Sequence, residues 1–205
     1  MSALQIVCLD LEGVLVPEIW INVAESAGIP ELRLTTRDIA DYDELMEYRI
    51  ALLRKHKINL EDIQKVIAGM GPLPGAGEFL AWLRGRYQVV ILSDTFYDFA
   101  MPLMAQLGYP TLFCHNLDVS NGWISGYALR QDNSKREAVR GFHRLNFKVI
   151  AAGDSYNDTA MLAEADAGIL HNPPDNVVAE FPQFPVSRDY GELRRHFEAA
   201  SGHLG

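Results

Sequence analysis

Three apolar runs along the chain each end on a polar residue. The runs are residues 6–10, 89–93 and 149–154, and their polar ends are Asp10, Ser93 and Asp154. Short unbroken apolar runs with β-branched residues are typical of strands that are buried on both faces of a parallel sheet. In open α/β sheets the ligand lies outside the carboxyl ends of the strands. We therefore expect these three polar side chains to meet in one crevice.

The first two runs are separated by far more chain than a parallel crossover needs, which is a dozen or more residues and a helix. We interpret residues 17–71 as an inserted helical subdomain, and residues 1–16 with 72–205 as the α/β domain. Apolar spacings of three and four predict a helix over 43–53, and Asn59 is a predicted N-cap for a second helix. The glycine-rich segment 69–77 predicts a turn back to the sheet rather than a phosphate loop, because no Gly-Lys-Ser/Thr follows it.

The rest of the chain alternates between helical and strand-like patterns. Helices are predicted over 97–107, 134–144 and 158–165 and at the C-terminal end, strands over 109–114 and 168–170, a hairpin over 117–125, and an irregular passage over 172–185. This alternation predicts an α/β fold with a Rossmann-like, doubly wound parallel sheet.

Acidic residues outnumber basic ones, with 27 Asp and Glu against 18 Lys and Arg and a formal net charge of −9. This balance disfavours nucleic acid as a partner, since nucleic-acid binding draws on clustered cations. No apolar stretch approaches the roughly 18 to 20 residues of a membrane helix, and no secretory signal is visible. Cys8 and Cys114 are interpreted as reduced core residues. We expect a soluble cytoplasmic protein that acts on small molecules, and we leave a homodimer open.

The tetrapeptide that begins at Asp10 carries two carboxylates. Alternation at an extended strand end places Asp10 and Glu12 on the same side, so that one carboxylate can attack while the other serves as acid and base. The competing interpretation is a solvated acidic turn. The segment 153–158 strengthens the catalytic interpretation, because Asp154 and Asp158 offer the hard oxygen ligands that Mg²⁺ prefers. Asp158 can equally be a helix-start residue that the helix dipole favours.

Ser93 and Lys135 are candidates for binding a phosphate. Ser93 can donate its hydroxyl, the following amides are expected to point from a helix start near Thr95, and Lys135 can supply a point charge. Each residue alone is more commonly structural or solvated. His115, beside Cys114, is interpreted as an ordinary histidine rather than a zinc ligand, because further thiols are absent.

Taken in order, these residues resemble the motifs of the haloacid dehalogenase superfamily of phosphohydrolases. The resemblance covers nearly the whole chain, from Asp10 through Ser93 and Lys135 to Gly-Asp-x-x-Asn-Asp at 153–158. Within the superfamily the chain is most similar to the phosphoserine phosphatase group, whose helical cap is inserted just after the first motif. The resemblance implies a Mg²⁺-dependent reaction in which the Asp10 nucleophile becomes an aspartyl-phosphate and Glu12 is the general acid and base.

The resemblance also assigns expected roles to other residues. The metal ligands are expected to be Asp10, Asp154 and the backbone carbonyl of Glu12. Arg49 is expected to bind the substrate carboxylate, and Glu18 is expected to bind the substrate ammonium. Asn157 is expected to contact the substrate or its phosphate. Asp158 is expected to orient Lys135 or a metal-bound water. Arg49 could instead be solvated, and Glu18 could cap the first helix of the insertion.

The sequence departs from the group's motifs at two places. Glu12 stands where an aspartate is usual. In addition, Ser93-Asp94-Thr95 replaces Ser-Gly-Gly, whose glycines let backbone amides approach a phosphate closely. Phosphate binding at the candidate position Asp94 is therefore in doubt unless the new side chains point away. The Asp-Leu-Glu-Gly form resembles bifunctional members of the group that transfer the phosphoryl group to homoserine. Two alternatives stay open, namely a phosphatase for another small phosphomonoester and a phospho-accepting receiver module.

Overall fold

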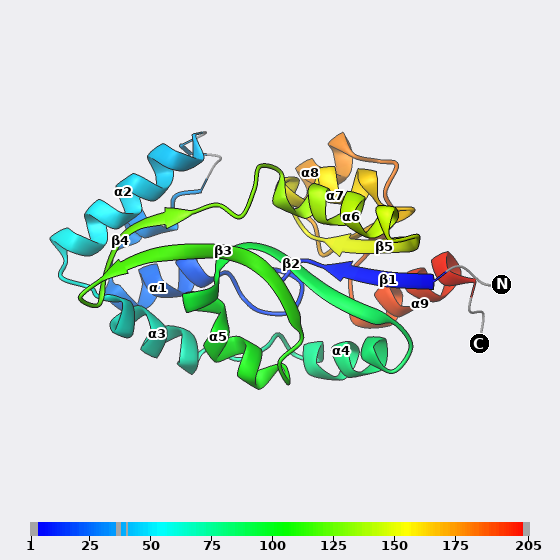
Figure 1. Cartoon of the computed structure of the whole chain (residues 1–205), viewed down its shortest axis with the longest axis horizontal. Coiled ribbons are helices and arrows are strands. Elements are labelled where there is room, and N and C mark those ends of the chain that lie inside the picture. Colours follow the sequence, from blue (N-terminus) through cyan, green and yellow to red (C-terminus); the bar gives the residue numbers. More distant parts are fainter. Residues whose placement is uncertain (1–3, 36–37, 40, 203–205) are drawn as a thin grey trace.

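A seven-stranded, mostly parallel sheet forms the centre of the computed structural model, which describes residues 4–35, 38–39 and 41–202 (Figure 1). The strands are β1 (Leu4–Leu9), β2 (Gln88–Phe96), β3 (Thr111–Ser120), β4 (Trp123–Ala128), β5 (Phe147–Gly153), β6 (Ala167–His171) and β7 (Val186–Ser187). Their order is β4-β3-β2-β1-β5-β6-β7, and β4 pairs antiparallel with β3. The predicted α/β fold with a parallel sheet is confirmed.

Helices cover both faces of this sheet (Figure 1). They are α1 (Ile19–Ala27), α2 (Tyr42–Lys55), α3 (Leu60–Gly69), α4 (Ala76–Arg84), α5 (Tyr97–Gln106), α6 (Ser134–Arg144), α7 (Thr159–Glu164), α8 (Asp175–Glu180) and α9 (Tyr190–Ser201), with short 3-10 helices at Pro30–Arg33 and Tyr156–Asp158. The alternation within β1 divides the core in two. Val7 and Leu9 join the cluster shared with α4, α5 and α9, whereas Ile6 and Cys8 join the cluster shared with α6, α7 and α8.

The segment between β1 and α4 forms helices that lie beyond one end of the sheet, beside β4 and the far end of β3 (Figure 1). In this segment α2 packs on β4, and α3 packs on α5. Asn59 is the N-cap of α3, as predicted, and its side chain accepts a hydrogen bond from the Asp62 amide at 3.0 Å. The glycine-rich segment turns back toward the sheet and leads into α4 at Ala76. The proposed division into two domains stays a prediction.

The passage 172–185 is not wholly irregular, contrary to the sequence-based prediction, because it contains α8. Pro174 precedes this helix with a φ of −62°, and Val177 on its first turn is fully buried. Pro174 is the N-cap residue, and its carbonyl accepts hydrogen bonds from the amides of Val177 at 3.0 Å and Val178 at 3.2 Å. The run of prolines therefore begins a short helix here.

The helix predicted over 97–107 is present as α5, but Thr95 still belongs to β2, which continues to Phe96, so the amide of Thr95 lies in a strand and not at the helix start. The cause is a long-range pairing. After an irregularity in register, Phe96 pairs with His115 of β3, and this holds the chain extended. The same strand β3 runs without a break through the two segments predicted as a strand and a hairpin arm. Among the described residues, no helix is long and apolar enough to cross a membrane.

Candidate active site

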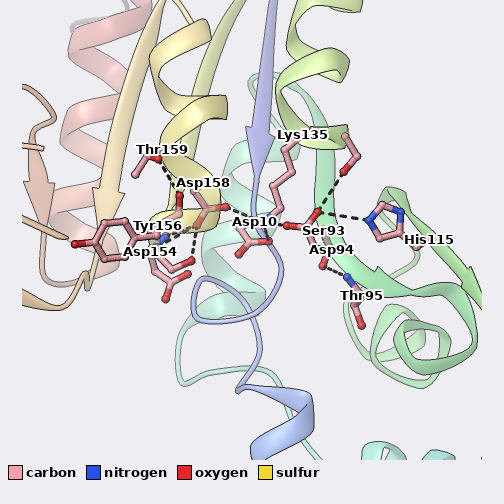
Figure 2. Close-up of polar contacts among 12 residues, drawn as sticks. Asp10, Ser93, Asp94, Thr95, His115, Lys135, Asp154, Tyr156, Asp158 and Thr159 are labelled. Carbon is pink, nitrogen blue, oxygen red and sulfur yellow. Dashed lines mark hydrogen bonds and ion pairs between the residues drawn. The ribbon is translucent and has the colours of Figure 1, made fainter. Parts of the chain in front are cut away.

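Asp10 lies at the centre of the candidate site, directly after the central strand β1, and its side chain is buried. Lys135, on the first turn of α6, reaches it from the neighbouring layer. Its Nζ donates to Asp10 Oδ1 at 2.8 Å and to Asp158 Oδ1 at 2.7 Å (Figure 2). Burial lowers the pKa of Lys135, but the surrounding carboxylates overcome this and hold the pKa well above its usual range. Lys135 is therefore a fixed cation between two carboxylates.

Asp158 is fully buried, and its two carboxylate oxygens have separate partners. Oδ1 accepts from Lys135, while Oδ2 accepts from the backbone amides of Asp154 at 2.9 Å and Ser155 at 3.1 Å. The approach is so close that a Cβ on Gly153 would lie 2.3 Å from the Asp158 carboxyl carbon. Asp158 thus contacts both the lysine and the loop after β5, and its oxygens are already engaged by donors.

Gly13 is a residue of the site that sequence reasoning missed. Its φ is +74°, and a Cβ built on it would lie 2.4 Å from Oδ2 of Asp154. Only glycine combines this left-handed backbone with such a close approach. A glycine just after a strand-end acidic motif was the available sequence signal. It lets the Asp154 carboxyl pack directly against the loop that carries Asp10.

A divalent cation fits the carboxylate cluster. Ligand oxygens of Asp10, Asp154 and Asp158 lie within 4.8 Å of one another. Burial and the charge of Asp158 raise the pKa of Asp10 well above its usual range, and the same causes raise that of Asp154 to about 7. Such crowded negative charge in a buried site is relieved by a bound cation, and oxygen ligands suit Mg²⁺.

The Glu12 side chain points toward the start of α1. Its Oε2 accepts a hydrogen bond at 2.8 Å from the amide of Ile19, the first residue of α1. Burial raises its pKa to about 8, and the charge of neighbouring Glu18 adds to this effect. Glu18 occupies the N-cap position of α1, and within the described part of the chain its side chain accepts no capping hydrogen bond from the helix amides. The helix amide thus fixes the position of the Glu12 carboxyl.

Residues 93–95, in the last part of β2, do not form a glycine-rich loop whose backbone amides could surround a phosphate. The buried Ser93 Oγ accepts from the Thr95 amide at 3.2 Å. The Asp94 carboxylate lies near Ser134, Lys135 and His115 instead (Figure 2). Although burial raises the pKa of Asp94, Lys135 and His115 lower it to about 2. His115, which the sequence favoured as an ordinary residue, is therefore part of the surroundings of the site.

Arg49 extends from α2 into the same site and is largely buried. Its Nη2 donates to the Leu34 carbonyl at 2.7 Å, and its guanidinium lies 4.5 Å from the centre of the Trp20 ring. Within the described residues, its Nε is buried without a hydrogen-bond partner. Burial lowers the pKa of Arg49 to about 10, which leaves it charged at neutral pH. Trp20, as its aromatic support, was not identified from the sequence.

These side chains converge on one cavity of about 540 Å³. It is lined by every residue that the sequence singled out for direct contact: Asp10, Glu12, Glu18, Arg49, Ser93, Asp94, Lys135, Asp154 and Asn157. Asp158 lies behind the cavity wall and contacts it through Lys135. The cavity therefore combines a buried carboxylate that is a candidate nucleophile with cationic side chains that could bind an anion. It also contains carboxylates that could bind a metal ion. The individual roles of these residues stay predictions.

Comparisons with known proteins agree with the family resemblance seen in the sequence. The family described as haloacid dehalogenase-like hydrolase matches residues 20–163. Phosphoserine phosphatase ThrH of Pseudomonas aeruginosa is 59% identical over 199 residues, which are 97% of each chain. A phosphoserine phosphatase of Pseudomonas syringae pv. tomato is 59% identical over 201 residues, covering 97% of this chain and 84% of the relative. A solved phospho-aspartyl intermediate analogue of phosphoserine phosphatase has a similar fold, with a TM-score of 0.77, 21% identity, and coverage of 95% and 99%.

Proposed function

The chain belongs to the haloacid dehalogenase-like hydrolases, and we propose that it is a Mg²⁺-dependent phosphoserine phosphatase that acts through an aspartyl-phosphate on Asp10. The observation that carries the proposal is the buried Asp10 carboxylate, held by Lys135 at the end of the central strand in a cavity that also contains Arg49 and Glu18. Relatives that are 59% identical are named phosphoserine phosphatases. Family membership argues against the receiver alternative.

In the proposed first step, the Asp10 oxygen that Lys135 does not contact attacks the phosphorus of O-phospho-L-serine. The bond from phosphorus to the serine oxygen breaks, and Glu12 gives that oxygen a proton. In the second step Glu12 takes a proton from the acceptor, whose oxygen attacks the phosphorus and releases Asp10. Lys135 and the Ser93 hydroxyl offset charge on the phosphoryl oxygens throughout, as phosphoryl transfer requires.

Mg²⁺ would be held by Asp10, Asp154 and the backbone carbonyl of Glu12. When bound, it supplies positive charge that offsets the repulsion between an anionic nucleophile and an anionic phosphate. Asp158 is assigned to orient Lys135, because both of its oxygens already accept hydrogen bonds from the protein.

Substrate selection is assigned to the part of the cavity near α1 and α2. Arg49 would bind the substrate carboxylate, which its stacking on Trp20 favours by holding the guanidinium in place. Glu18 would bind the ammonium group, and Asn157 would contact the substrate or its phosphate. A phosphomonoester without the amino acid groups would lose both charged contacts, and this sets the proposal apart from the alternative of another small phosphomonoester.

We further propose that homoserine can replace water as the acceptor. Its hydroxyl would approach the phosphorus as the serine oxygen does, and closure of residues 17–71 over the cavity would exclude water. The place of action is proposed to be the cytoplasm, where the buried, unpaired Cys8 and Cys114 would remain reduced.

The proposal is tested with purified protein, Mg²⁺ and a panel of small phosphomonoesters, with and without homoserine. We expect O-phospho-L-serine to give the highest kcat/KM, a chelator to abolish turnover, and Mg²⁺ to restore it. Separated products should include O-phosphohomoserine when homoserine is present. A preference for a substrate without carboxylate and ammonium groups contradicts the substrate assignment, and absence of O-phosphohomoserine removes the transfer activity alone.

A further inference from the structure

Asp94 places a negative charge directly after the residue proposed to bind the phosphate. Its Oδ2 lies 3.5 Å from Lys135 Nζ, the same ammonium that contacts Asp10 Oδ1 at 2.8 Å. A phosphoryl group on Asp10 would therefore lie close to a second anion. At such distances the repulsion between like charges in a partly buried site is large enough to oppose phosphate binding.

The contacts of Asp94 direct its Oδ1 toward the start of α6 and strand β3. Oδ1 accepts a hydrogen bond from the hydroxyl of Ser134 at 3.2 Å and lies 3.6 Å from Nε2 of His115 (Figure 2). Ser134 and His115 line a second cavity of about 390 Å³, adjacent to the active-site cavity, and Asp94 lies on the wall of both. The Asp94 side chain is 36% exposed, so the surrounding packing alone does not fix its orientation. The contacts with Ser134 and His115 do this instead.

The tautomer of the neutral His115 ring follows from its other neighbour. Nδ1 accepts a hydrogen bond from the backbone amide of Arg130 at 2.9 Å, which requires an unprotonated Nδ1. The proton of the neutral ring is then on Nε2, the nitrogen that faces Asp94. His115 is only 3% exposed, and its pairing with Phe96 fixes its backbone beside β2. His115 thus presents a fixed N–H to Asp94.

We propose that His115 is a positioning residue for phosphate binding: with Ser134, it holds the Asp94 carboxylate turned toward α6, so that this charge does not face the phosphate oxygens. The inference rests on the proposed function for the place where phosphate binds. It explains how an aspartate can follow Ser93 in a phosphate pocket. His115 itself contacts neither substrate nor metal in this account.

The test is a double-variant cycle read by calorimetric binding of inorganic phosphate in the presence of Mg²⁺. His115→Asn keeps an oxygen near the Nδ1 position for the Arg130 amide but removes the donor to Asp94. We expect it to raise the Kd for phosphate about tenfold and to raise KM for the phosphomonoester more than it lowers kcat. His115→Gln, whose amide nitrogen reaches the Nε2 position, should restore most of the affinity.

The Asp94→Asn background distinguishes positioning from a general structural role. There the added His115→Asn change should leave the phosphate Kd within about twofold of that of Asp94→Asn alone, because no charge remains to be held. An equal loss of affinity in both backgrounds, or no loss in either, overturns the proposal. Absence of phosphoserine turnover by the unaltered protein would instead count against the proposed function, since phosphate binding is measured separately.

A second measurement needs no variant. Heteronuclear NMR of the ring nitrogens should show His115 protonated at Nε2 and unprotonated at Nδ1. The opposite tautomer would overturn the proposal even if a His115 variant failed to fold.

Discussion

Glu12 is one methylene longer than the aspartate usual at its position, and the structure ties this length to the start of α1. Its carboxyl accepts the Ile19 amide at 2.8 Å. Glu12→Asp withdraws the carboxyl by about 1.5 Å, one carbon–carbon bond, which breaks this hydrogen bond. A hydrogen bond to a neutral carboxyl contributes about 0.5–1.5 kcal/mol, and a correctly placed general acid contributes roughly 10²–10⁴ in rate. We expect kcat for O-phospho-L-serine to fall by about 10² or more.

The assay compares two leaving groups and two variants. An aryl phosphate with an acidic leaving group needs little protonation, so the first step with this substrate should be slowed much less by Glu12→Asp. Glu12→Gln is the matched control, since it retains the reach to Ile19 but cannot donate a carboxyl proton. It should keep thermal stability close to that of the unaltered protein yet lose phosphoserine turnover. Glu12→Asp with an unchanged kcat for phosphoserine would refute the reasoning.

Three further predictions concern other parts of the structure. Gly13→Ala places a Cβ 2.4 Å from Oδ2 of Asp154 in a backbone with φ of +74°, so a Mg²⁺ titration of activity should show at least about tenfold weaker activation. Trp20→Leu removes the ring beneath the Arg49 guanidinium, so KM for phosphoserine should rise about fivefold. Burial lowers the pKa of His171 from 6.5 to about 4. The unfolded chain therefore binds a proton that the folded protein does not, so the stability of the unaltered protein relative to His171→Asn should fall by up to about 3 kcal/mol between pH 6.5 and 4 in denaturant unfolding.

Matched controls separate these effects from general damage. Gly28 has a similar φ of +66° with nothing within 4 Å of a built Cβ, so Gly28→Ala should strain the backbone without weakening Mg²⁺ activation. An equal loss in both glycine variants contradicts the crowding argument. Trp20→Leu should barely change KM for a phosphomonoester without a carboxylate, and an equal rise for both substrates would contradict the role given to Arg49. An unchanged pH slope in His171→Asn would rule out that histidine as its source.

The meeting of Asp10, Ser93 and Asp154 could be predicted because it follows from short-range pattern and sheet geometry. Each residue ends an apolar run, and the carboxyl ends of parallel strands share one edge of the sheet. The presence of Glu18 and Arg49 in the same cavity could be expected only from family resemblance, since they come from the inserted segment. No local pattern indicates where α1 and α2 lie relative to the sheet.

Other features depend on contacts that are remote in the sequence. The position of His115 beside Asp94 requires the register between β2 and β3, which the pairing with Phe96 sets. The same pairing extends β2 past Thr95 to Phe96, directly before the predicted helix. Trp20 beneath Arg49 requires a particular placement of α1 relative to α2. Apolar patterns indicate which strands exist, but they do not determine such registers and crossings.

The central claim is that Asp10 accepts the phosphoryl group of O-phospho-L-serine. The most direct measurement is rapid acid quenching during turnover with Mg²⁺, followed by mass spectrometry of the peptide that contains Asp10, alongside Asp10→Asn. We predict one phosphoryl group on Asp10 in the unaltered protein, and neither the adduct nor turnover in Asp10→Asn. Turnover of Asp10→Asn near the unaltered rate would contradict the account.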